Sequence, residues 1–114
     1  MFNATVTREG NIHVVYMRGR LNLVNSEDFS KVLQSLISED NNEVILEMSE
    51  LEYITSDGLK PILNWLQATR LRAPQGKRRL ALCNLQDFVK TIFRHTGFDK
   101  QLPIYDSIHA AIRG

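Results

Sequence analysis

The sequence predicts a single α/β domain over residues 1–114, with a mainly parallel sheet of four to five strands packed against helices. Short apolar runs of strand character alternate along the chain with segments that carry apolar residues at helical spacing. A strand–helix–strand order makes neighbouring strands parallel and places the connecting helices on the sheet. The expected order is β-β-α-β-α-β-α-β-α, in a chain long enough for one hydrophobic core.

The first two strands are expected to form a hairpin. Residues 3–8 and 12–17 favour β structure, and residues 9–11 have the composition of a turn. Gly19 is expected to end the second strand. Ser26 is expected to cap the next helix, whose buried stripe has helical spacing: Phe29, Val32, Leu33, Leu36 and Ile37.

A strand buried on both faces is expected over residues 43–48, after turn residues at 40–42. The period becomes helical after Ser56, where four apolar residues form a stripe: Leu59, Ile62, Leu63 and Leu66. Pro61 fits only the first helical turn, so a kink or a late helix start is expected. Trp65 is interpreted as a partly buried flank of this helix, and the alternative is an anchor for a partner protein.

The last third of the chain predicts two further strand–helix pairs. A strand is expected at residues 79–83, followed by a helix that ends at Gly97. A short strand at 102–105 precedes a final helix capped by Asp106 or Ser107. The third helix is expected to bury one apolar face: Phe88, Val89, Ile92 and Phe93. Leu36 and Ile45 are expected to be core residues.

The charge balance gives no support for nucleic-acid binding, because the net charge is only +1. One basic cluster surrounds the loop at residues 73–76: Arg70, Arg72, Lys77, Arg78 and Arg79. It is interpreted as a solvated loop, and the alternative is a phosphate-binding patch.

The chain is expected to act in the cytoplasm and without a membrane. No apolar run approaches the roughly 20 residues that span a bilayer, and residues 1–9 lack the apolar region of a signal peptide. The single cysteine, Cys83, cannot form an intramolecular disulfide, which favours a reducing compartment. Its apolar surroundings indicate a small buried side chain rather than a nucleophile.

The sequence does not predict an enzyme, a cofactor or a metal site. The three histidines are scattered, and none has the spacing of metal ligands. Neither a nucleophile elbow around Ser56 nor a glycine-rich phosphate loop is present. A hydrolase built on Ser56 would need a histidine brought close by the fold.

Ser56 is the main candidate for a functional residue, because it stands where the chain turns from strand to helix. Its hydroxyl oxygen could cap the N–H groups of the first helical turn, which is a structural use. A phosphoryl group on it would place a dianion at the positive end of the helix dipole, which would make the protein a switch.

The whole chain resembles the STAS domain, and within that family the stand-alone bacterial anti-sigma factor antagonists. The resemblance rests on segments in the correct order: VYMRGRLN at 15–22, VILEM at 44–48 with LEYI at 51–54, TSDGL at 55–59, and LALCNL at 80–85 followed by Phe93 and residues 96–98. Two family aspartates are replaced, by Asn22 and Thr55, and an acidic residue, Asp57, follows Ser56 instead.

The resemblance implies a regulator that switches partners. In such proteins an anti-sigma factor that is also a serine kinase phosphorylates the serine matching Ser56. The unmodified antagonist binds this partner, the phosphorylated form releases it, and a serine phosphatase resets it. The binding face is expected at two neighbouring turns: Asn22, Thr55, Ser56, Asp57, Gly58 and Lys60. The alternative is a constitutive STAS subunit of another complex, in lipid transport or stress signalling, with Ser56 only a helix cap.

Overall fold

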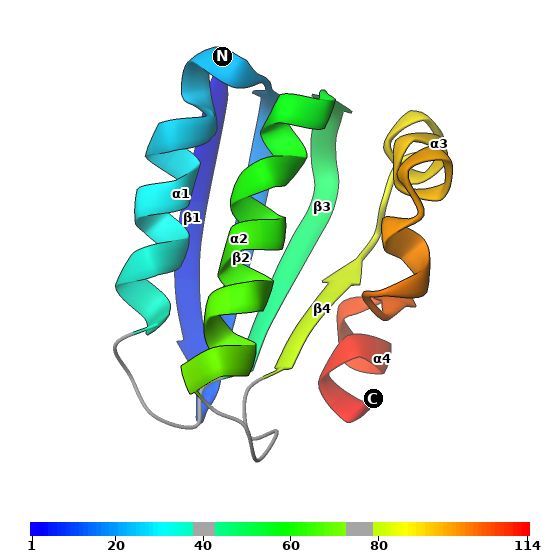
Figure 1. Cartoon of the computed structure of the whole chain (residues 1–114). Coiled ribbons are helices and arrows are strands. Elements are labelled where there is room, and N and C mark those ends of the chain that lie inside the picture. Colours follow the sequence, from blue (N-terminus) through cyan, green and yellow to red (C-terminus); the bar gives the residue numbers. More distant parts are fainter. Residues whose placement is uncertain (38–42, 73–78) are drawn as a thin grey trace.

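The computed structural model describes residues 1–37, 43–72 and 79–114, and its five strands form one sheet in chain order (Figure 1). The strands are β1 Phe2–Glu9, β2 Ile12–Leu21, β3 Glu43–Ile54, β4 Arg79–Cys83 and β5 Ile104–Tyr105. The β1–β2 pair is antiparallel, and the other three neighbouring pairs are parallel. The predicted α/β class, element order and mainly parallel sheet are therefore confirmed.

The helices are α1 Leu23–Ile37, α2 Ser56–Arg72, α3 Asp87–Thr96 and α4 Ile108–Arg113, with a short 3-10 helix, η1 Phe98–Lys100. Helices α1 and α2 lie side by side over the sheet (Figure 1). The larger apolar cluster joins one face of the sheet to α1, α2 and α3. A smaller cluster on the other face is closed by α4: Val14, Ile45, Ala81, Cys83 and Ala111. Leu36 and Ile45 are buried, as predicted.

Helix α1 begins earlier than the predicted cap at Ser26. The Asn22 Oδ1 atom accepts hydrogen bonds from the backbone N–H groups of Val24, at 3.0 Å, and Asn25, at 3.3 Å. The Asn25 Oδ1 atom accepts in return from the Asn22 N–H at 2.8 Å. This reciprocal cap satisfies the first turn, so the helix starts at Leu23.

Three predictions about β2 and α2 are wrong. Strand β2 continues past Gly19, which adopts a φ of 94°, and ends at Leu21. Of the two expectations for Pro61, the late helix start is wrong, because α2 begins at Ser56 and contains Pro61 in its interior, whereas the kink stays a prediction. Trp65 is not a flank but a core residue, 3% exposed, whose Nε1–H donates to the Leu33 carbonyl of α1 at 2.7 Å. The same burial removes Trp65 as a partner anchor.

The C-terminal third agrees with the sequence at its caps and differs at one aromatic side chain. Gly97 ends α3 with a φ of 80°, and the Ser107 hydroxyl accepts from the Ala110 N–H at 3.1 Å. The strand expected at 102–105 is reduced to β5. Phe88 is half exposed instead of buried. The turn at 40–42, the loop at 73–76 and the basic side chains beside that loop lie outside the described residues.

Candidate functional site

Two helices begin side by side because they follow neighbouring parallel strands. Leu21, the last residue of β2, pairs with Ile54, the last residue of β3. One linking residue, Asn22 or Thr55, then leads into α1 or α2, at the same end of the molecule (Figure 1). The Thr55 N–H donates to the Leu21 carbonyl at 3.0 Å, which fastens the two turns together. The candidate site lies at this edge, outside the carboxyl ends of the strands.

Thr55, and not Ser56, caps α2. The Thr55 Oγ1 atom accepts from the Gly58 N–H at 3.1 Å, and the Thr55 carbonyl accepts the Leu59 N–H, also at 3.1 Å. Ser56 is the first helical residue and is exposed, and its hydroxyl forms no hydrogen bond within the described part of the chain. The interpretation of Ser56 as a helix cap is therefore wrong. The hydroxyl is left available for chemistry.

Gly58 sets the position of Ser56 by allowing α2 to lie directly on the end of β2. A Cβ atom at Gly58 would stand 2.6 Å from the Leu21 carbonyl oxygen. That oxygen belongs to the backbone and is held by the Thr55 N–H, so it has little room to move. Only glycine fits this close approach, and the first turn of α2 is thereby held against the sheet.

A charged pair stands next to Ser56 on the first turn and a half of α2. The Asp57 Oδ1 and Lys60 Nζ atoms are 3.3 Å apart, and the two side chains are 43% and 70% exposed. Asp57 lies at the positive end of the helix dipole, which favours a carboxylate. The two charges offset each other, so the surface beside Ser56 carries no net charge from this pair.

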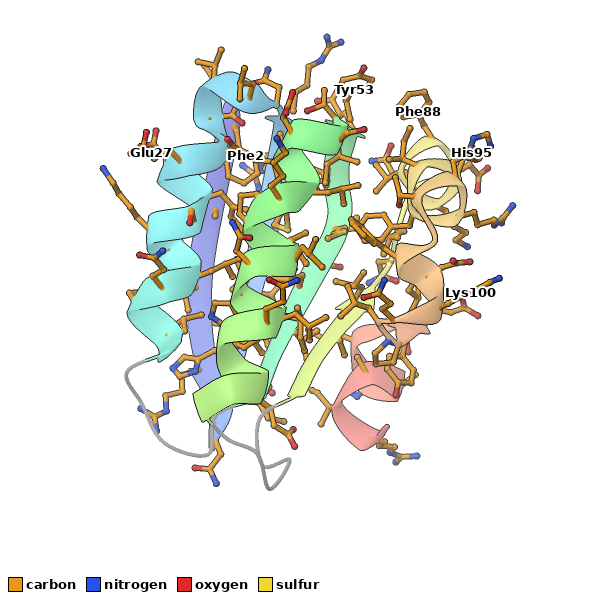
Figure 2. All side chains as sticks on the ribbon, viewed as in Figure 1. Phe2, Glu27, Tyr53, Phe88, His95 and Lys100 are labelled. Carbon is orange, nitrogen blue, oxygen red and sulfur yellow. The ribbon has the colours of Figure 1, made fainter. Side chains whose placement is uncertain are left out.

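Exposed apolar side chains flank these turns, and the sequence did not predict them as part of the site. Leu23 and Val24, 66% and 89% exposed, form the first turn of α1 beside Asn22. The Tyr53 and Phe88 rings stack with centroids 5.1 Å apart, and both lie at the end where α2 begins (Figure 2). Leu23 and Val24 could have been found, since they fall outside the helical stripe. The aromatic pair joins β3 to α3, and no local sequence pattern predicts that these two rings meet.

The six residues predicted for partner binding come together at this edge, which we call the Ser56 edge: Asn22, Thr55, Ser56, Asp57, Gly58 and Lys60. Asn22 and Thr55 are the caps of the two helices, and Gly58 is buried. Ser56, Asp57 and Lys60 present side chains to solvent. The edge is thus a surface of exposed groups on a scaffold of capped turns.

A cluster of metal ligands is not assembled in the described residues, and the Cys83 thiol is buried. These residues contain no cluster of three or more histidine, cysteine or acidic side chains that could hold a metal ion. Burial, and after it the negative charge of Glu47, raises the pKa of the Cys83 thiol to about 11. A protonated, buried thiol is a poor nucleophile. The described helices also include none with the length and apolar character needed to cross a bilayer.

Comparison with known proteins places the chain in a single family. The family model for the STAS domain matches residues 3–111. A Bordetella bronchiseptica protein named as a candidate anti-sigma factor antagonist, BtrV, is 31% identical over 107 residues, which cover 94% of this chain and 89% of that protein.

Solved structures share the fold at low sequence identity. A candidate anti-sigma factor antagonist from Thermotoga maritima has a TM-score of 0.84 at 22% identity, covering 96% of this chain and 92% of that one. The anti-sigma factor antagonist SpoIIAA in its unphosphorylated form has a TM-score of 0.79 at 16% identity, covering 96% and 93%. A murine anion transporter, Slc26a9, matches 93% of this chain with 18% of its own, at 20% identity and a TM-score of 0.75.

Proposed function

The chain belongs to the STAS domain family, and from that premise we propose that it is an anti-sigma factor antagonist controlled by phosphorylation of Ser56. The unmodified protein binds an anti-sigma factor that is also a serine kinase, which frees the sigma factor. Phosphorylation releases this partner, and a serine phosphatase restores the unmodified form. The protein acts by binding, without catalysis of its own, in the cytoplasm. The relative from Bordetella bronchiseptica supports the antagonist role by its name.

The observation that carries the proposal is the exposed hydroxyl of Ser56. Because Thr55 provides the helix cap, the Ser56 hydroxyl has no structural task in the described residues. It stands at the N-terminus of a 17-residue helix, where the dipole favours an added anion. A phosphoryl group can be added there without breaking a bond that holds the fold.

The modification is an ordinary phosphoryl transfer. The Ser56 Oγ atom attacks the γ-phosphorus of ATP, a new O–P bond forms, and the bond from that phosphorus to the β-phosphate oxygen breaks. ADP leaves, and the hydroxyl proton passes to a base of the kinase. A phosphatase adds water to the phosphoserine and returns the hydroxyl and inorganic phosphate.

Charge on an apolar contact surface explains how release would follow. The Ser56 edge is flanked by Leu23 and Val24 and by the Tyr53–Phe88 pair, so a partner seated there covers apolar groups. The phosphoryl group adds about −1.5 to −2 charges, which must lose water within that contact. A coupling of about 1–3 kcal/mol would lower partner affinity roughly 5- to 150-fold.

A second candidate function is that of a constitutive interaction subunit. The match to a part of the murine transporter favours it, because the same fold there belongs to a much longer chain. In that case the Ser56 edge binds a fixed partner, in lipid transport or stress signalling, and no phosphate is found on Ser56 in cells.

Incubation with the cognate anti-sigma kinase and ATP, followed by mass mapping of the phosphosite, tests the proposal. We expect phosphate on Ser56, none in Ser56→Ala, and at least a fivefold loss of partner affinity for the phosphorylated protein in calorimetry. Ser35→Ala, an exposed serine near the other end of α1, is the matched control and should behave as the unmodified sequence does. Equal affinities of modified and unmodified protein would refute the switch and favour the constitutive subunit.

A further inference from the structure

We propose that Lys60 is the built-in counterion of phosphorylated Ser56: its ammonium group leaves the Asp57 carboxylate and pairs with the phosphoryl group. The inference rests on the proposed function only in that Ser56 carries a phosphate. Lys60 is thus assigned an effect on the charge state of the phosphorylated site and no part in the phosphorylation itself.

The spacing along α2 brings both acidic groups within reach of one lysine. Lys60 follows Asp57 by three positions and Ser56 by four, and both separations place side chains on the same helix surface. The Lys60 Nζ atom already lies 3.3 Å from Asp57 Oδ1, so the side chain extends back toward the first turn. Because the Lys60 side chain is 70% exposed, its ammonium group can turn from Asp57 to Ser56 without displacing packed atoms.

Charge decides the exchange. A phosphoserine carries about −1.5 to −2 charges and three strong acceptor oxygens, against one charge on a carboxylate. An acidic group four residues before a lysine is also the favourable orientation of a helical pair. Asp57 loses its partner but remains in the first turn of α2, where the dipole and solvent stabilise its charge.

The exchange determines the form in which the phosphate meets the partner. The second proton of a phosphoserine dissociates at about pH 6. A neighbouring ammonium group therefore shifts the equilibrium between monoanion and dianion further toward the dianion at neutral pH. Neighbouring elements also carry charged groups, among them Arg20 on β2, Glu27 and Asp28 on α1, Glu52 on β3 and Asp87 on α3. They are the same in all variants compared, so differences between variants report on Lys60.

The test uses the 114-residue chain with phosphoserine introduced at position 56 during translation, so that neither kinase nor partner is needed. The phosphate pKa is read from a ³¹P NMR titration. Lys60→Gln should raise it by about 0.2–0.4 unit, as expected for losing one helical ion pair. Lys60→Arg should restore it, and Lys90→Gln on α3, the matched control, should leave it within about 0.1 unit, below the size of one such pair.

Competition by Asp57 is tested in the same way. Lys60→Gln should shift the phosphate pKa at least as much in an Asp57→Asn background, because the rival carboxylate is gone. If Lys60→Gln matches Lys90→Gln, the proposal is overturned while the phosphosite experiment stands unaffected. If no kinase modifies Ser56, the proposed function fails and this titration still decides the role of Lys60.

Discussion

At the scale of single residues, Thr55 and Ser56 divide two tasks between adjacent hydroxyl groups. Thr55→Ala removes the oxygen that accepts the Gly58 N–H, so it should lower the free energy of unfolding by about 0.5–2 kcal/mol. Ser56→Ala removes an exposed hydroxyl and should change it by less than about 0.5 kcal/mol. Urea denaturation of both variants checks this. A larger loss from Ser56→Ala would mean that Ser56 is the cap.

Asn22 has a structural role as the cap of α1 in addition to its place on the predicted binding face. Asn22 and Lys60 both belong to the predicted binding face, so a substitution at either is expected to weaken partner binding. Because Asn22 accepts two N–H groups of α1, its replacement should also destabilise the fold by about 0.5–2 kcal/mol. Lys60 is exposed and caps nothing, so Lys60→Gln is the cleaner probe of partner affinity.

The buried thiol of Cys83 predicts a pH dependence of stability. Its pKa is raised from 9.0 to about 11, first by burial and then by Glu47. Between these values the unfolded chain loses the thiol proton and the folded chain keeps it, so folding becomes less favourable as pH rises. The wild-type free energy of unfolding should therefore fall more steeply than that of Cys83→Ala across this window. Parallel slopes in guanidinium denaturation would contradict the pKa shift.

At the scale of elements, the packing of α2 on β2 depends on one glycine. Alanine is normally better than glycine inside a helix by about 0.5–1 kcal/mol. Gly58→Ala should instead destabilise the protein by about 1–3 kcal/mol, because the new Cβ would meet the Leu21 carbonyl oxygen. Asn64→Ala, at an exposed position of the same helix, is the matched control and should be neutral or stabilising. Thermal unfolding of the two variants distinguishes the cases.

The sequence predicts element types well and element starts less well, for a physical reason. Apolar periodicity is a property of the whole segment, so the stripe from Phe29 to Leu36 is visible without knowing where α1 begins. A helix start depends on which polar side chain accepts hydrogen bonds from the first backbone N–H groups of the helix. Asn22 rather than Ser26 caps α1, and Thr55 rather than Ser56 caps α2, because the backbone turns from strand to helix at Asn22 and at Thr55.

The candidate site could be located from the sequence, while the aromatic pair beside it could not. The turns at Asn22 and Thr55 follow adjacent parallel strands, so their meeting at one edge is a consequence of topology. The stacking of Tyr53 on Phe88 depends on how far β3 extends and where α3 is placed. Likewise, Trp65 is buried because its indole N–H finds the Leu33 carbonyl on another helix.

At the scale of the whole molecule, the sheet separates two apolar clusters, and each cluster holds different helices in place. The larger cluster fixes α1 and α2, whose first turns form the Ser56 edge. The smaller cluster fixes α4 on the opposite face. A modification at Ser56 therefore needs no change in either cluster to alter the surface that a partner meets.

This separation predicts that core substitutions on the two faces act independently. Leu36 belongs to the larger cluster and Ile45 to the smaller one. Leu36→Ala should cost about 2–5 kcal/mol and Ile45→Val about 0.5–1.5 kcal/mol. Residues without shared partners usually add to within about 0.5 kcal/mol, so the double variant should lose the sum of the two costs.

Denaturant unfolding of the two single variants and the double variant measures the coupling, with fluorescence of the single tryptophan, Trp65, as one signal. Because Trp65 lies in the larger cluster, far-ultraviolet circular dichroism should be recorded alongside it to follow the whole fold. Coincident transitions would show that both faces unfold together although their local costs add. A coupling well above about 0.5 kcal/mol would mean that the two faces of the sheet are energetically linked. The Ser56 edge and α4 could then not be treated as independent.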